Sequence, residues 1–90
     1  MRRITIFGAT GSIGQNTLDL IGRDRDAYQV VALTGDQNIA QLAGDAIKFN
    51  AEIAVTADPA RFDDLRAALS GSNVEAAAGP AALIDAASRP

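Results

Sequence analysis

Residues 3–14 constrain the fold of this chain more than any other stretch. They combine an apolar run, three glycines at regular spacing and the start of an amphipathic segment. The apolar run is typical of a buried strand and consists of Ile4, Ile6 and Phe7. The glycines that follow are Gly8, Gly11 and Gly14. The residues that then recur at helical spacing are Ile13, Thr17, Leu20 and Ile21. The sequence therefore predicts a strand, a glycine turn and a helix that meet at one point.

The glycine turn has the properties of an anion site. Glycine lets the backbone bend sharply, approach a ligand closely and bring the helix against the strand without an intervening Cβ. The first turn of the helix leaves N–H groups unpaired near Ser12 and Ile13, where the helix dipole is positive. A pyrophosphate is the most natural ligand for such a site.

The spacing of the glycines excludes one class of nucleotide site but does not by itself identify the class that is present. Gly-x-x-Gly-x-x-Gly differs from the strict dinucleotide pattern Gly-x-Gly-x-x-Gly, although the predicted strand before it and helix after it match that pattern. A phosphate-loop NTPase is excluded, because no lysine directly follows any of these glycines. A tight turn with no ligand remains an alternative, but a bare turn does not require so many glycines and hydroxyls.

Composition limits the chemistry of the chain. Its 90 residues suffice for one small domain but not for a cofactor site and a separate catalytic domain, so we expect an incomplete dinucleotide-binding domain over residues 1–90. The absence of histidine removes the commonest general base, and the absence of cysteine removes disulfides and thiolate sites. We assign no catalytic and no metal-binding residue within the chain.

Charge and hydropathy limit the partners. The net charge is −3 and the eight basic residues are thinly spread, which is unlike a surface for nucleic acid or an anionic membrane. No apolar run approaches the roughly twenty residues of a membrane span. Because the first predicted strand begins within about three residues of Met1, we expect no signal peptide. We expect a cytoplasmic protein that binds neither nucleic acid nor membrane.

The rest of the chain alternates between strand and helix patterns. The first helix is expected to end near Ile21, where Gly22 can stop it. Further strands are predicted at residues 30–33, 52–56 and 74–76, and further helices begin at Asn38, Pro59 and Pro80. The continuous apolar run at 30–33 fits a parallel sheet that is buried on both faces. The predicted fold class is α/β, a Rossmann-like doubly wound parallel sheet of alternating β-α units in three layers, with helices on both faces.

The end of the second predicted strand supplies the other half of the expected site. In a doubly wound sheet a nucleotide lies across the carboxyl ends of the strands, which places residues 34–38 near the adenosine ribose. Asp36 lies near the position where an acidic residue usually holds the ribose 2′-hydroxyl, which favours NAD. Alternatively, its carboxylate turns to solvent or stabilises the first turn of the second helix. Asn38 is predicted to cap that helix and is a candidate donor to a ribose or phosphate oxygen.

Several motifs spread along the chain occur together in one enzyme family. They are Gly-Ala-Thr-Gly-Ser-Ile-Gly at 8–14, Thr-Leu-Asp at 17–19, Val-Val-Ala-Leu at 30–33, and Asn38. Ala-Asp-Pro at 57–59 and Glu-Ala-Ala-Ala-Gly at 75–79 extend the likeness over essentially the whole chain. In these motifs the chain resembles the amino-terminal part of the 1-deoxy-D-xylulose 5-phosphate reductoisomerase family.

The resemblance implies an NADPH-dependent enzyme of non-mevalonate isoprenoid biosynthesis, which rearranges and reduces a sugar phosphate to 2-C-methyl-D-erythritol 4-phosphate. It also implies a homodimer and a divalent metal, Mg²⁺ or Mn²⁺, with the metal and substrate ligands beyond residue 90. Carried over to this sequence, the residues that bind the cofactor phosphates are Thr10, Gly11, Ser12 and Ile13. Asn38 is carried over to the adenosine end. Together with the neighbouring Gly35, Asp36 and Gln37 at the end of the second predicted strand, it completes the predicted set of cofactor-binding residues.

One departure from the family pattern concerns the adenosine end. The family usually has glycine and then lysine or arginine just before the asparagine, whereas this chain has Asp36 and Gln37 before Asn38. We expect backbone N–H groups at the start of the second helix, together with the side-chain amides of Gln37 and Asn38, to replace the missing cation.

Two other interpretations stay open at this point. Another NAD(P)-dependent dehydrogenase, such as a semialdehyde or short-chain dehydrogenase, would need a nucleophilic cysteine or a Tyr-x-x-x-Lys pair further along the chain. A non-catalytic nucleotide-sensing module, complete at this length, would be stable and monodisperse. An incomplete domain would instead expose an apolar sheet edge and dissolve poorly.

Overall fold

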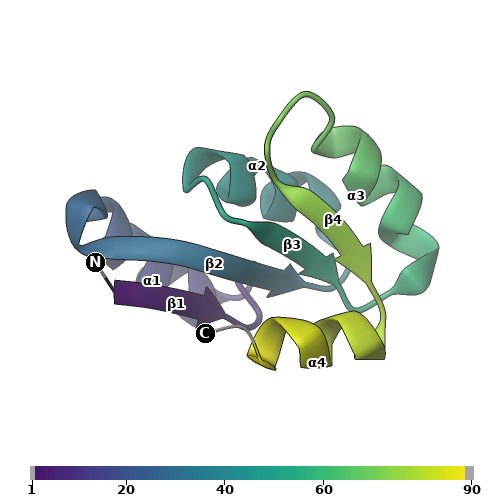
Figure 1. The fold of residues 1–90 in the computed structure, drawn as a ribbon, viewed down its shortest axis with the longest axis horizontal. Helices are drawn as coiled ribbons and strands as arrows, with labels where there is room; N and C mark the ends of the chain where they lie inside the picture. The colour runs from purple at the N-terminus through teal and green to yellow at the C-terminus, as the bar shows by residue number, and fades with distance from the viewer. Residues whose placement is uncertain (1, 89–90) are drawn as a thin grey trace.

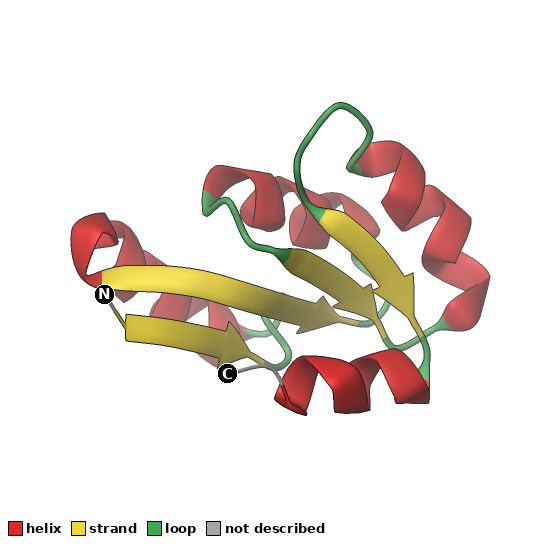
Figure 2. Cartoon of the chain, in the orientation of Figure 1, coloured by secondary structure: helices red, strands yellow, loops and turns green. Residues whose placement is uncertain are grey.

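The computed structural model describes residues 2–88, which form one parallel sheet with helices between its strands. The strands lie side by side in the order of the sequence, as β1 (Arg2–Ile6), β2 (Tyr28–Gly35), β3 (Ile53–Thr56) and β4 (Glu75–Ala78). All four arrows point the same way in Figure 2, so the carboxyl ends of the strands form one edge of the sheet.

The helices alternate with these strands along the chain. The α-helices are α1 (Ser12–Gly22), α2 (Ile39–Lys48), α3 (Phe62–Ala68) and α4 (Pro80–Ser88). Two short 3-10 helices, η1 (Arg25–Ala27) and η2 (Pro59–Arg61), precede β2 and α3. The alternation of strand and helix predicted from the sequence is confirmed.

The helices cover both faces of the sheet, as predicted. Neighbouring parallel strands that follow one another in sequence are joined by right-handed crossovers, which puts the connecting helices α1, α2 and α3 on the same face. Figure 1 shows α2 and α3 together on one side of the strands and α4, in yellow, on the other. The core between α1–α3 and the sheet includes Leu18, Leu33, Leu42 and Leu65. The core beneath α4 includes Ile53, Val55 and Ala86. The doubly wound, three-layer α/β fold is therefore confirmed.

The structure corrects the predicted apolar face of α1. Ile13 and Leu20 are 82% and 65% exposed, whereas the buried positions of α1 are Gly14, Leu18 and Ile21. The helix is rotated in this way because Gly14, which has no side chain, has to lie against the preceding turn. Phe7 is also not part of a buried strand: β1 ends at Ile6, and Phe7 is 54% exposed.

The bounds of the other elements differ from the prediction by a few residues. β2 begins at Tyr28, because this residue and Gln29 pair with Arg2 and Arg3 of β1. β3 begins one residue later than predicted, and β4 covers residues 75–78. The start signal at Asp58 forms η2 first, and α3 follows it.

Candidate functional site

The turn after β1 is fastened to the end of β2. Gly8 has a φ of 68°, a left-handed conformation that glycine adopts without strain. Its N–H donates to the Thr34 hydroxyl at 2.9 Å, and the Ala9 N–H donates to the Thr34 carbonyl at 2.7 Å. Within the turn, the Gly11 N–H donates to the Gly8 carbonyl at 3.0 Å. These hydrogen bonds fix the turn at the carboxyl edge of the sheet.

Gly14 lets α1 begin directly against this turn. A Cβ at Gly14 would lie 2.4 Å from the Gly8 carbonyl oxygen and 2.6 Å from the Ala9 Cα. Ala9 is itself fully buried, with 0% of its surface exposed. Backbone atoms cannot give way as the end of a flexible side chain can. Glycine at position 14 is therefore required for packing, whether or not a ligand binds.

The amino end of α1 is exposed and has no side-chain cap. Gly11 is the N-cap, no side chain among the described residues accepts a hydrogen bond there, and the first turn carries no acidic residue. Gly11, Ser12 and Ile13 are all exposed. The first N–H groups of a helix have no acceptor within the helix, so those of Ser12 and Ile13 are open to an anion at the positive end of the dipole. This arrangement suits a phosphate group.

The turn contacts the loop that follows β2. A Cβ at Gly35 would lie 3.4 Å from Cγ2 of Thr10 and 3.3 Å from a methyl group of Leu42, so β2 ends directly beside Thr10. The structure thereby brings the two groups of predicted site residues to one edge of the sheet. The first group, in the turn and α1, is Thr10, Gly11, Ser12 and Ile13. The second group, at the end of β2 and before α2, is Gly35, Asp36, Gln37 and Asn38.

Asn38 caps α2, as predicted. Its Oδ1 accepts a hydrogen bond from the Gln41 N–H at 3.3 Å, and its Nδ2 donates to Gln41 Oε1 at 3.0 Å. Asp36 is exposed and precedes this cap, and the first turn of α2 contains no acidic residue. Asp36 therefore lies before the first turn rather than in it, and its Oδ1 accepts a hydrogen bond from Gln37 Nε2 at 3.4 Å.

Gln37 joins the loop after β2 to the segment after β3. Its Nε2 donates to Asp58 Oδ2 at 2.8 Å, and its Oε1 accepts from Arg61 Nε at 3.1 Å. Asp58 also accepts a hydrogen bond from the Ala60 N–H at 3.0 Å. The Gln37 hydrogen bond, then the Ala60 N–H, and to a smaller degree the charge of Arg61 hold the pKa of Asp58 below its ordinary value, against a small opposing effect of desolvation. Asp58 is therefore ionised at neutral pH.

Two buried threonines hold these loops in place, a role that the sequence did not predict for either of them. Thr34 and Thr56 are 4% and 0% exposed. The Thr56 hydroxyl donates to the Asp36 carbonyl at 2.8 Å and accepts from the Asp58 N–H at 3.2 Å. Each threonine thus binds the loop that follows the preceding strand. The one signal in the sequence was a hydroxyl residue near the carboxyl end of an otherwise apolar strand.

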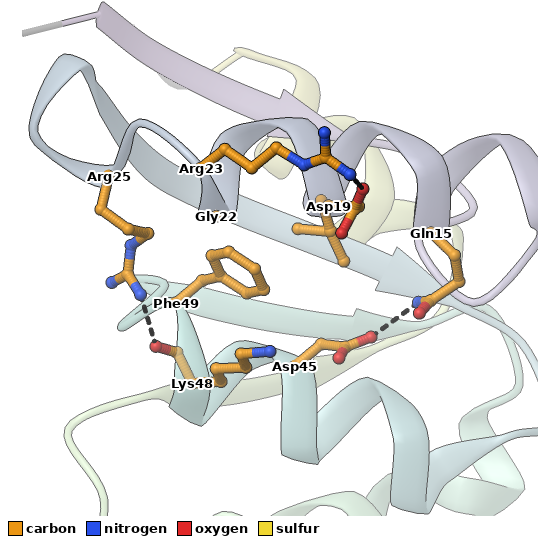
Figure 3. A pocket seen from close by; sticks show the side chains of 9 residues that line it. Gln15, Asp19, Gly22, Arg23, Arg25, Asp45, Lys48 and Phe49 are labelled. Atoms are coloured by element: carbon orange, nitrogen blue, oxygen red, sulfur yellow. Dashed lines mark hydrogen bonds and ion pairs between the residues drawn. The ribbon is translucent and has the colours of Figure 1, made fainter.

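Gln15 is a third residue that the sequence analysis missed. Its Nε2 donates to the Ala9 carbonyl at 2.7 Å and to Asp45 Oδ2 at 2.8 Å, so it ties the glycine turn to α2. It lines one end of a pocket of about 330 Å³ between α1 and α2, shown in Figure 3. At the other end, Arg25 donates to the Lys48 carbonyl at 3.0 Å. None of the predicted site residues lines this pocket, so it is separate from the anion site.

The structure shows no metal centre in the part of the chain that it describes. Within residues 2–88, no group of three or more carboxylates lies close enough together to hold an ion. The predicted metal ligands fall outside this chain and stay a prediction. None of the described helices combines the length and the hydropathy needed to cross a membrane.

Comparison with known sequences identifies a family. Residues 4–90 match the family model described as 1-deoxy-D-xylulose 5-phosphate reductoisomerase. A protein of that name from Ruegeria pomeroyi is 69% identical over 90 residues, and the match covers 100% of this chain but 23% of the relative. A second, from Zymomonas mobilis, is 57% identical over 86 residues, which are 96% of this chain and 22% of the relative. The chain therefore spans less than a quarter of the length of these relatives.

Comparison with solved structures gives the same family. The structure of the Zymomonas mobilis reductoisomerase in complex with NADPH superposes with a TM-score of 0.94 at 57% identity, over 96% of this chain and 23% of that one. A reductoisomerase in complex with NADPH, fosmidomycin and magnesium superposes with a TM-score of 0.91 at 30% identity, over 97% of this chain and 22% of that one. The fold of residues 2–88 is thus shared with proteins whose structures contain NADPH.

Proposed function

The chain belongs to the 1-deoxy-D-xylulose 5-phosphate reductoisomerase family, and from that premise we propose that it is the amino-terminal, cofactor-binding part of an NADPH-dependent enzyme. The whole enzyme would convert 1-deoxy-D-xylulose 5-phosphate to 2-C-methyl-D-erythritol 4-phosphate in non-mevalonate isoprenoid biosynthesis. Family membership removes the alternative of an unrelated dehydrogenase. The catalytic, substrate-binding and metal-binding residues of the enzyme would lie outside residues 1–90.

The observation that carries this proposal is the exposed amino end of α1. NADPH brings a pyrophosphate, and the Ser12 and Ile13 N–H groups offer uncharged donors to it without a competing acidic side chain in the first turn. Gly14 and the hydrogen bonds to Thr34 hold these donors in place before any ligand arrives. Preorganised donors of this kind bind an anion without first having to be ordered.

The second group of residues would bind the adenosine half of the cofactor. Gly35 ends β2 beside Thr10, so a ligand seated on α1 continues over the loop that contains Gln37 and Asn38. When bound, NADPH would supply the hydride for the reduction step. The residues of this chain would bind and orient the cofactor, and none of them is assigned a proton transfer.

Exposed apolar side chains support the proposal that these residues are part of a larger unit. Ile13 and Leu20 on α1 are 82% and 65% exposed, Phe7 after β1 is 54% exposed, and Ile84 on α4 is 68% exposed. Further domains of the enzyme would cover side chains of this kind. We place the complete enzyme in the cytoplasm, as expected from the sequence, and propose that it is a homodimer that uses Mg²⁺ or Mn²⁺, in line with the family resemblance.

Calorimetric titration of the full-length protein with NADPH tests the proposal, with Gly11→Leu as the variant. A Cβ at Gly11 would lie 3.4 Å from the Gly8 carbonyl oxygen, an ordinary contact, and the φ of Gly11 is −77°, so the variant should fold. The new side chain would occupy the space in front of the Ser12 and Ile13 amides. We expect NADPH affinity to fall at least about tenfold, which corresponds to about 1.4 kcal/mol.

Gly44→Leu is the matched control, because Gly44 lies exposed in α2 and a Cβ added there would meet no atom within 4 Å. This control should bind NADPH as the wild type does. Unchanged NADPH affinity in a folded Gly11→Leu variant would contradict the proposal. Tight NADPH binding without turnover of the sugar phosphate in the wild-type protein would instead favour a nucleotide-sensing module.

A further inference from the structure

The adenosine end of the site has no cation in its own loop. NADPH differs from NADH by a 2′-phosphate, which is anionic at neutral pH and requires a positive partner. Residues 34–41 contain neither lysine nor arginine and do contain Asp36. The side-chain amide nitrogens of Gln37 and Asn38, which we expected to replace that cation, already donate to Asp58 and Gln41. If NADPH is the cofactor, a positive charge would therefore come from another element of the fold.

The fold brings such a charge to this loop from η2. Arg61 is separated from Gln37 by 24 positions in the sequence, yet its Nε donates to Gln37 Oε1 at 3.1 Å. We propose that Arg61 binds the 2′-phosphate and is the residue that gives this protein its preference for NADPH over NADH. This inference rests on the proposed function and names a specificity-determining residue within the same site.

Gln37 and Asp58 hold the Arg61 side chain at the adenosine end. The Gln37 amide bridges the two groups, since its oxygen accepts from Arg61 and its nitrogen donates to Asp58 Oδ2 at 2.8 Å. Two hydrogen bonds hold Asp58 in place. Its carboxylate accepts one from the Ala60 N–H, and its backbone N–H donates one to the Thr56 hydroxyl. The guanidinium is therefore positioned over the loop before a ligand binds.

The guanidinium of Arg61 still has donors to offer. Of its five N–H groups, Nε–H is used by Gln37, and one on Nη1 is used by Asp64 Oδ2 at 3.4 Å. The side chain is 47% exposed, so a ligand can reach it. An exposed ion pair such as Arg61–Asp64 contributes little to stability, and a phosphate can replace it with two parallel charge-assisted hydrogen bonds.

Nearby carboxylates would repel the 2′-phosphate, so a positive charge at Arg61 matters more for binding it. The carboxylates of Asp36 and Asp58 accept hydrogen bonds from Gln37, and that of Asp64 accepts one from Arg61. Both carboxylate oxygens of Asp58 already accept hydrogen bonds, from Gln37 and from the Ala60 N–H, which disperses its charge. Without Arg61, the charged side chains left in this group would all be negative, namely Asp36, Asp58 and Asp64. The loss of Arg61 should therefore affect NADPH alone and leave NADH binding intact.

Equilibrium titration of the full-length protein with NADPH and, separately, with NADH tests this inference. We expect Arg61→Ala to weaken NADPH binding roughly ten- to hundredfold and to change NADH binding less than about twofold. Arg61→Lys, which keeps the charge but loses the paired donors, should lie between wild type and Arg61→Ala. Raised salt should weaken NADPH binding more in the wild type than in Arg61→Ala.

Arg66→Ala is the matched control, because Arg66 lies on the neighbouring helix α3, is 71% exposed and pairs with Asp63 at 3.9 Å. Arg66→Ala also removes one positive charge, but Arg66 makes no hydrogen bond to Gln37. The affinities for NADPH and for NADH should both stay at their wild-type values. An unchanged ratio of NADPH to NADH affinity in Arg61→Ala, or an equal loss of both, would overturn the assignment of Arg61. Failure of the wild-type protein to bind either dinucleotide would instead overturn the proposed function.

Discussion

At the scale of single residues, a missing side chain decides how closely α1 approaches the glycine turn. The nearest atoms to a Cβ at Gly14 are backbone atoms of Gly8 and Ala9, which are held by hydrogen bonds to Thr34. An added methyl group would have to push α1 away from the turn. The amides of Ser12 and Ile13 would then move with the helix.

Gly14→Ala should therefore destabilise this domain by about 1–3 kcal/mol, the usual cost of overpacking. Gly44→Ala is the opposite case, because it fills open space on an exposed helix and should stabilise the domain by about 0.5–1 kcal/mol. Urea denaturation of both variants measures the difference. Equal stabilities would show that the close contact at Gly14 is not a constraint.

Residue roles were predictable from the sequence where the cause is local. Gly14 and the Asn38 cap follow from short-range patterns, and the structure confirms both. The hydrogen bonds of Thr56 and Arg61 join residues 20 and 24 positions apart, so no local sequence pattern predicts them. They depend on which strands become neighbours, and that is a property of the fold.

At the scale of elements, η2 links two connections at the carboxyl edge. Asp58 precedes η2 and accepts hydrogen bonds from the Ala60 N–H and from Gln37 of the other loop. The pKa of Asp58 is lowered in the folded chain, mainly by Gln37, so the folded state favours the ionised carboxylate. The stability gained in this way is present above the unfolded pKa of about 3.9 and is lost as the pH falls through the lower folded pKa.

Asp58→Asn should consequently lower the melting temperature at pH 7, and this deficit should shrink as the pH falls below about 4. Gln37→Ala, which leaves the charge of Asp58 in place, should remove most of the same pH dependence. Thermal melts between about pH 7 and about pH 3 check both variants. A deficit of Asp58→Asn that stays constant across this range would contradict the role given to the ionised carboxylate.

The orientation of α1 shows the limit of sequence patterns at this scale. Ile13 and Leu20 lie two helical turns apart and suggest a buried face, but both are exposed. Hydrophobic periodicity shows which side chains are apolar. It does not show that the close backbone contact at Gly14 determines which side of the helix faces the sheet. The helix itself was predicted correctly, and its rotation was not.

At the scale of the whole molecule, the parallel sheet gathers the ends of four strands at one edge. The alternation of buried strands with helices predicted this, because such alternation produces right-handed crossovers. The same alternation predicted helices on both faces of the sheet. Among the described helices, α4 lies on the face opposite α1, α2 and α3. What the pattern did not reveal was how the loops at that edge contact one another through Thr34, Thr56 and Gln37.

Hydrogen exchange of backbone amides, measured on the full-length protein with and without saturating NADPH, tests most directly whether the amino end of α1 holds the cofactor. We expect slower exchange at residues 10–15 in the presence of NADPH, because the Ser12 and Ile13 amides would donate to its pyrophosphate. The distant connection at residues 70–74, between α3 and β4, should exchange at the same rate in both samples. Unchanged exchange at residues 10–15 in protein saturated with NADPH would mean that the amino end of α1 does not hold the cofactor.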